Sequence, residues 1–139
     1  MAPNLAATLL CELVRLPEVC LVVGPDAAVC EAFVEPAALA VRLEGTWVTL
    51  ESTPWHLHFD TAQVRRIAFE VKPDTAHHSE RLSYSVRFFD ADGQALLRAF
   101  FLNMYDDRGA LRPERVQQFE ALRARAGQRD EVWCSPDPL

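Results

Sequence analysis

Lysine, glycine and long apolar runs are all scarce in this chain. Only one of its 14 basic residues is a lysine, Lys72, and the formal net charge is -6. This acidic balance lacks the basic footprint of a nucleic-acid-binding protein and the lysine-rich segment that favours an anionic membrane. We therefore expect neither nucleic acid nor a membrane as a partner. With five glycines and no GxSxG motif, neither a nucleotide-binding loop nor a serine nucleophile is expected.

The chain also lacks the patterns of a membrane-spanning or secreted protein. No apolar run approaches the roughly 20 residues that a spanning helix needs, and the N-terminus has no basic segment of a signal peptide. The four cysteines, Cys11, Cys20, Cys30 and Cys134, show neither CxxC spacing nor zinc-type pairing with histidine. We expect a cytoplasmic protein with reduced thiols, in which Cys11, Cys20 and Cys30 are small core residues.

What the chain does contain predicts one α+β domain over residues 1–139. Leucines at helical spacing predict a helix near residues 4–16, with Asn4 as its N-cap. A second helix is predicted from Pro113 to about Ala126. Between them, alternating segments separated by turn residues predict antiparallel strands. These segments are 19–23, 29–34, 39–43, 46–52, 55–60, 65–72 and a hairpin over 81–104. The sequence thus favours antiparallel sheet flanked by an N-terminal and a C-terminal helix, with a loosely packed tail after Gly127.

The segment 55–60 contains the side chains best suited to bind a metal. Its apolar residues fall on one parity, and His56, His58 and Asp60 fall on the other. Because side chains alternate between the faces of an extended chain, this strand should have an apolar face and an imidazole face. Histidine is the commonest metal ligand among side chains and titrates near neutral pH. We expect the rest of the sequence to build a sheet that holds this face open.

The residue types alone leave other interpretations of these histidines. His58 could be an ordinary exposed histidine on a polar strand face. Alternatively, His56 and His58 could bind a bare ion such as zinc, with Asp60 as an oxygen ligand. A third ligand would then have to come from another strand or from His77–His78, which lie in a predicted loop, since catalytic zinc normally takes three protein ligands.

Three stretches, taken in order, resemble a known family. They run from HFD to RIAFEVKP (58–73), from SYSVRFFDADG to QAL (83–96), and from LRPE to FEAL (111–122). Together they resemble the C-terminal half of the heme-utilisation proteins of the HemS/ChuX/HutX type. The resemblance implies an antiparallel sheet flanked by helices, in a unit that pairs as a homodimer or is duplicated in longer chains. It implies a bacterial, cytoplasmic protein that binds, stores or hands over heme, while some longer relatives also degrade it.

The resemblance also implies candidate iron ligands. In the shorter members, a histidine at the start of the strand before the IAxxEK-like stretch ligates the heme iron, and His58 holds that position. His56 is an alternative ligand or a contact for the porphyrin edge. The shorter members carry a second histidine in an early strand, but the matching register here falls at about Gly24, with no histidine nearby. A divergent member that has lost heme binding and serves as a dimeric interaction module is therefore a further alternative.

Arginines are the candidates for holding the two heme propionates, because a guanidinium pairs well with a carboxylate. Arg65 follows the histidine strand, while Arg87 and Arg98 lie on the 81–104 hairpin. Arg87 has the parity opposite to the core residues of its strand, so we expect it to share the open face with the histidines. The plainer interpretation is that these arginines are solubilising charges. The aromatic residues are expected mainly in the core, and they include Trp47, Trp55, Phe88, Phe100 and Phe101.

Overall fold

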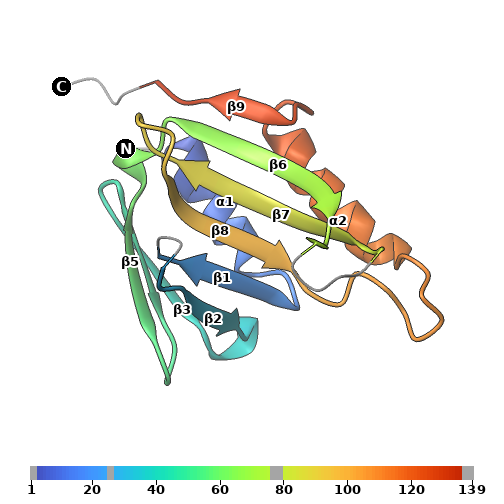
Figure 1. Cartoon of the computed structure of the whole chain (residues 1–139). Helices are drawn as coiled ribbons and strands as arrows, with labels where there is room; N and C mark the ends of the chain where they lie inside the picture. The colour runs from blue at the N-terminus through green and yellow to red at the C-terminus, as the bar shows by residue number, and fades with distance from the viewer. Residues whose placement is uncertain (1–2, 25–26, 76–79, 136–139) are drawn as a thin grey trace.

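The computed structural model describes residues 3–24, 27–75 and 80–135, which form two helices and two antiparallel sheets (Figure 1). The helices are α1 (Leu5–Leu13) and α2 (Pro113–Arg125). The strands are β1 (Val19–Val23), β2 (Cys30–Val34), β3 (Ala40–Glu44), β4 (Trp47–Glu51), β5 (His56–Asp60), β6 (Arg66–Pro73), β7 (Leu82–Phe89), β8 (Ala95–Phe101) and β9 (Glu131–Trp133). The predicted α+β class is confirmed. Neither helix in the described part of the chain has the length and apolar character that a membrane crossing needs.

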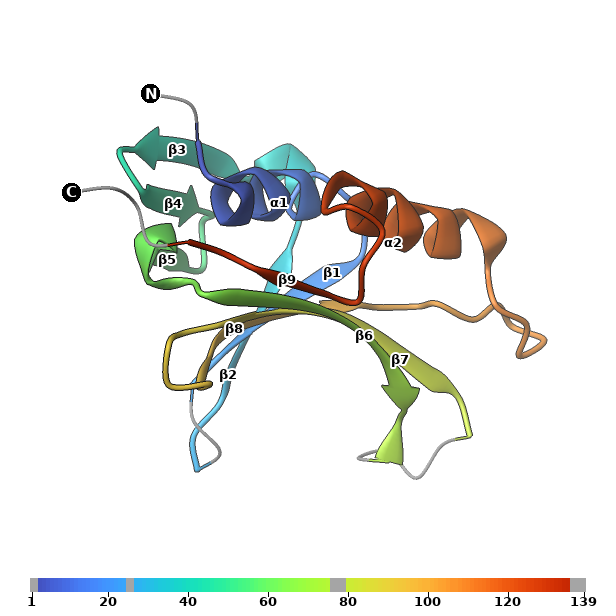
Figure 2. The ribbon, with the colours of Figure 1, turned by 90° about the horizontal axis from the view of Figure 1, so that it is seen from above.

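The strands divide between a large and a small sheet. The large sheet has the order β2-β1-β8-β7-β6-β9, and the small one has the order β3-β4-β5. Both helices lie on one side of the large sheet, with the β3–β4 part of the small sheet beside α1 (Figure 2). The large sheet curves, and its other side is free of helices (Figure 2). We call this side the concave face.

The core forms between the helices and the large sheet. In the central strands alternate residues point to the helices and most of them are buried, as Val86 and Phe88 of β7 show. From α2, Phe119 meets the rings of Phe69, Tyr84 and Phe101 edge-on, with centroid distances of 5.2–5.9 Å. Edge-to-face contacts of this kind add to the stabilisation from buried area.

The small sheet joins this core through its inner face. Val48 and Leu50 of β4 are fully buried, and Phe59 of β5 meets Phe88 edge-on at 5.9 Å. Because side chains alternate along a strand, the opposite parity of β5 points outward. This leaves His56 and His58 exposed, as the alternation of residues 55–60 predicted.

The structure corrects several boundaries and assignments. Asn4 caps α1 by accepting a hydrogen bond from the Ala7 amide at 2.9 Å, but the helix ends at Leu13 rather than near residue 16. The tail after Gly127 is not merely loose, because β9 pairs with β6. Cys11 and Cys20 are buried as predicted, whereas Cys30 is exposed. The core prediction is also wrong for two aromatic residues, because the Trp47 side chain is 48% exposed and Phe100 lies on the concave face, opposite in parity to the buried residues of β8.

A buried arginine ties α2 to two turns of the large sheet. The Arg115 side chain is only 1% exposed. Its guanidinium donates hydrogen bonds to the carbonyls of Pro17, Glu18 and Leu102 at 2.8–3.0 Å, and a fourth to Gln118 at 2.7 Å. The carbonyls belong to the chain entering β1 and leaving β8. These four hydrogen bonds offset much of the cost of burying the charge.

Loss of this guanidinium should destabilise the fold strongly. We expect Arg115→Ala to lower the free energy of unfolding by about 2–4 kcal/mol, because buried carbonyls lose their donors and a cavity is left. Urea denaturation followed by circular dichroism measures the change. Arg125→Ala is the matched control, since Arg125 is exposed and pairs with Glu12 at the surface, and should change stability by less than about 1 kcal/mol. Equal losses in the two variants would contradict the assignment.

A second prediction concerns acid stability. The Arg112 guanidinium donates a hydrogen bond to Glu18 at 3.0 Å and thereby lowers the pKa of the Glu18 carboxyl below its usual value. A group whose pKa is lowered by folding stabilises the native state above its unfolded pKa and loses this effect as the pH falls through the folded pKa. The difference in unfolding free energy between the unmodified protein and Glu18→Gln should therefore be constant near neutral pH. It should shrink below about pH 4, and urea titrations across this range measure it. A difference that persists unchanged at pH 2 would refute this role.

Candidate functional site

The outer face of the small sheet displays both histidines. In the strand register, His58 lies opposite Thr49 and His56 lies opposite Glu51. The Nδ1 atom of His58 forms a hydrogen bond with the Thr49 hydroxyl at 3.2 Å. In the tautomer with the hydrogen on Nδ1, that atom donates the hydrogen bond to the Thr49 hydroxyl. Nε2 is then unprotonated and can bind a metal. Such a bond to the second ring nitrogen is typical of metal-ligating histidines, whose tautomer and orientation it fixes.

The remaining polar residues of this face are engaged with each other. Arg42 forms an ion pair with Glu51 at 2.6 Å across the β3–β4 pair. Asp60 accepts a hydrogen bond from the Thr46 hydroxyl at 2.7 Å and caps the turn Thr61–Gln63 through the Ala62 amide. Asp60 is thus a structural capping residue rather than a free oxygen ligand.

The zinc alternative finds no third ligand in the described part of the chain. No group of three or more His, Cys, Asp or Glu side chains among the described residues could hold a metal ion. His77 and His78, the other suggested ligands, lie outside the described residues. Two neighbouring histidines without a third protein ligand do not make a zinc site of the usual kind.

The backbone at Gly24, where the family resemblance implies a second histidine, disfavours any residue with a side chain. Gly24 has a φ of +121°, a conformation that residues with a Cβ rarely adopt. A Cβ added there would also collide with the backbone carbonyl of Ala28. The backbone after β1 therefore does not accommodate a histidine at position 24.

Arg87 and Arg98 lie on the large sheet, away from the histidines. They are opposite one another on β7 and β8, on the concave face. The expectation that Arg87 shares the open face with His58 is therefore not met within one chain. Arg87 pairs with Glu70 at 2.7 Å, whereas Arg98 donates a hydrogen bond to the Gly24 carbonyl at 3.1 Å.

A cavity of about 610 Å³ opens on the concave face beside Arg98. Its floor includes a row that runs across three paired strands, formed by Phe33, Cys20 and Phe100. Farther along, residues that follow β8 complete the wall, among them Tyr105. Sequence reasoning missed Phe33, although its parity in β2, opposite to that of the buried Ala32 and Val34, placed it on this face.

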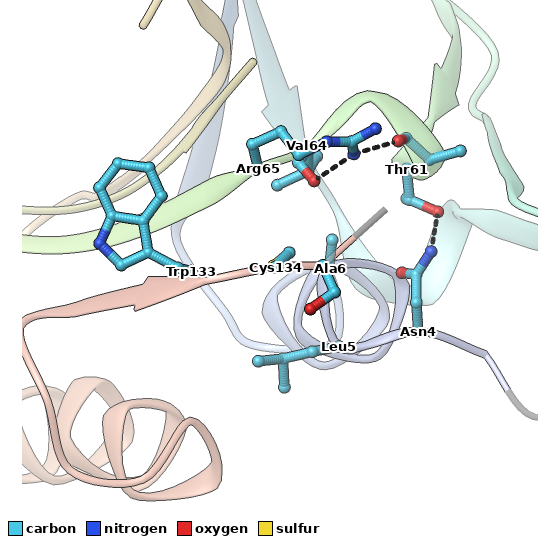
Figure 3. A pocket seen from close by; sticks show the side chains of 10 residues that line it. Asn4, Leu5, Ala6, Thr61, Val64, Arg65, Trp133 and Cys134 are labelled. Carbon is cyan, nitrogen blue, oxygen red and sulfur yellow. Dashed lines mark hydrogen bonds between the residues drawn. The ribbon is translucent and has the colours of Figure 1, made fainter. Parts of the chain in front are cut away.

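Arg65 lies in a third place, in a small cavity between α1, the chain entering β6, and the chain leaving β9 (Figure 3). The cavity measures about 180 Å³, and Trp133 lies at one side of it. The Arg65 guanidinium donates hydrogen bonds to the carbonyls of Ala62 and Val64 at 2.6 and 3.0 Å. The predicted arginines and histidines thus occupy three separate surfaces, and none of the cavities described here is lined by His56 or His58.

Comparison with solved structures identifies ChuX among the similar folds. One ChuX crystal structure has 20% sequence identity and a TM-score of 0.69, and the match covers 88% of this chain and 72% of that one. A second, described as the heme-binding protein ChuX, has 21% identity and a TM-score of 0.65, with 84% and 69% coverage. At this identity the likeness establishes the fold. No curated protein matches the sequence significantly.

Two longer proteins share the same fold over about a third of their length. Holo-PhuS, a heme-binding protein from Pseudomonas aeruginosa, has 16% identity and a TM-score of 0.66, with 86% of this chain and 33% of that chain covered. ChuS, a heme oxygenase from E. coli, has 15% identity and a TM-score of 0.62, with 84% and 35% covered. A protein-family model independently matches residues 7–126, most of the chain. This sequence match and the shared fold together show that the chain belongs to the ChuX/HemS-like family.

Proposed function

We propose that this protein binds heme as a storage or trafficking protein of heme utilisation, with His58 as the ligand of the iron. Family membership and the heme-binding proteins ChuX and PhuS among the similar structures support the cofactor. The observation that carries the proposal is the exposed imidazole of His58, whose Nδ1 atom is bonded to Thr49. The chemistry fits, because a neutral imidazole nitrogen is a common axial ligand of heme iron.

His56 is the second candidate on the same face. It lies two residues from His58 on one exposed strand, roughly 6–7 Å along the chain. No hydrogen bond of the His56 side chain is found among the described residues, whereas His58 is oriented by Thr49. Since an oriented imidazole loses less conformational freedom on binding, we assign the iron to His58 and a supporting contact with the porphyrin edge to His56.

Heme titration tests this assignment. We expect ferric heme at micromolar concentration to produce a saturable Soret shift, and His58→Ala to weaken binding at least about tenfold, as expected for loss of a metal ligand. His56→Ala is the matched control on the same face and should change affinity by less than about threefold. Absence of a saturable shift with the unmodified protein would remove the proposed function. A normal shift with His58→Ala would instead remove only the ligand assignment.

Heme degradation is the second candidate function, because ChuS, one of the similar structures, is a heme oxygenase. The same heme complex distinguishes the two functions. After addition of a reductant in air, a binding protein keeps its heme spectrum, whereas a heme-degrading enzyme bleaches the Soret band and releases iron. We expect the spectrum to persist, since His58 lies on an exposed strand face that does not exclude water from the reaction.

We also propose that the chain forms a homodimer, as the family resemblance implies. The support is the exposed apolar surface, since Phe33 and Trp133 are 59% and 72% exposed and large exposed apolar side chains commonly mark an interface. Light scattering coupled to size exclusion should give twice the chain mass at micromolar concentration. Replacing Phe33 with Glu should shift the population toward monomer if the concave face takes part, and Leu43→Glu on the small sheet serves as the comparison. A chain that is monomeric throughout would contradict the proposal.

A further inference from the structure

Two imidazoles of the small sheet are placed to act together. His56 and His58 are both exposed and lie two residues apart on β5, on the outer face of the sheet. Side chains at this spacing on a strand point the same way, with their bases roughly 6–7 Å apart. Two imidazole rings that start at this separation can lean toward each other, so that one nitrogen of each contacts a single ion between them.

Each ring has a nitrogen available for such an ion. The hydrogen bond between Nδ1 of His58 and the Thr49 hydroxyl, at 3.2 Å, leaves Nε2 of His58 free. A bond of this kind to the second ring nitrogen is typical of histidines that bind metals. No hydrogen bond of the His56 ring is found among the described residues, so this ring can turn either nitrogen toward the ion.

The charges around the two histidines favour a cation. Glu51 lies opposite His56 in the strand register, where cross-strand Cβ atoms are about 4.5–5.5 Å apart. Glu51 also pairs with Arg42 at 2.6 Å, so the guanidinium on this face is compensated and repels a metal ion less. The formal net charge of the whole chain is -6, which attracts cations toward its surface.

The donor set decides the class of ion. No group of three or more His, Cys, Asp or Glu side chains forms a metal site in the described part of the chain, so the two histidines do not form the closed tetrahedral site of structural zinc. Tetragonal sites of nitrogen and oxygen donors are typical of divalent copper and nickel, and imidazole suits both ions. Two imidazole nitrogens and two water oxygens complete such a plane.

We propose that His56 and His58 chelate one divalent copper or nickel ion, with water in the remaining positions of a tetragonal site. The ion keeps its oxidation state on binding. This site takes a bare ion without a porphyrin, and it is independent of the proposed heme function. Because both ligands need the His58 imidazole, the bare ion and heme exclude one another at this position.

Calorimetric titration with Ni²⁺ tests the chelate, since Ni²⁺ does not oxidise the exposed thiol of Cys30. We expect one ion per chain at micromolar concentration. His56→Ala and His58→Ala should each weaken binding at least about tenfold, because one imidazole alone loses the advantage of a second linked ligand. The double variant His77→Ala/His78→Ala is the matched control. It removes the other two histidines of the chain and should bind Ni²⁺ as the unmodified protein does.

A spectroscopic measurement reports the ligands directly. In a Cys30→Ser background, Cu²⁺ should give a tetragonal electron paramagnetic resonance spectrum with coupling to two nitrogens. Circular dichroism checks that the variants fold, which is expected because both substituted histidines are exposed. Coupling to a single nitrogen would overturn the chelate.

The outcomes separate this inference from the proposed function. His56→Ala should weaken Ni²⁺ at least about tenfold but heme by less than about threefold. Equally weak Ni²⁺ binding by the unmodified protein and both single variants would overturn the chelate, and so would loss of binding in the His77→Ala/His78→Ala variant. Normal heme binding without Ni²⁺ chelation would remove this inference alone. Ni²⁺ chelation without a Soret shift on addition of heme would remove the proposed function alone.

Discussion

The architecture depends on one buried cation. Arg115 extends from α2 to the carbonyls of residues 17 and 18 and to the carbonyl of Leu102, and so joins a helix to the entrance of β1 and the exit of β8. The polypeptide makes an unfavourable turn at this point, because Glu18 has a φ of +57° without being glycine. The guanidinium holds that turn and the chain leaving β8, which forms part of the wall of the concave cavity. A structural contact inside the protein therefore shapes the surface where a ligand can bind.

The division into two sheets separates two kinds of chemistry. The small sheet presents imidazoles that are exposed to solvent, on a strand held against the core by Phe59. The large sheet presents guanidinium and aromatic groups on a curved surface. Within one chain the histidines and the Arg87–Arg98 pair lie on different sheets.

Alternation in the sequence was enough to predict β1 to β8 and the direction of most of their side chains. The outward orientation of His58 and the capping role of Asn4 followed from local patterns. Alternation reports which face a residue occupies but not which sheet its strand joins, and for this reason Arg87 was placed with the histidines. The strand Glu131–Trp133 was missed because three residues at a sheet edge carry almost no periodic signal. Its pairing with β6 is a tertiary contact across more than sixty residues.

The position of β1 within the large sheet has a consequence for synthesis of the protein. β1 lies between β2 and β8, so one of its edges stays unpaired until residue Phe101 has been made. At translation speeds of roughly 5–20 residues per second, the apolar segment Val19–Val23 waits on the order of 4–16 seconds for that neighbour. During this interval the nascent chain exposes a strand edge that another chain could pair with. A high concentration of nascent chains therefore favours intermolecular association during this interval.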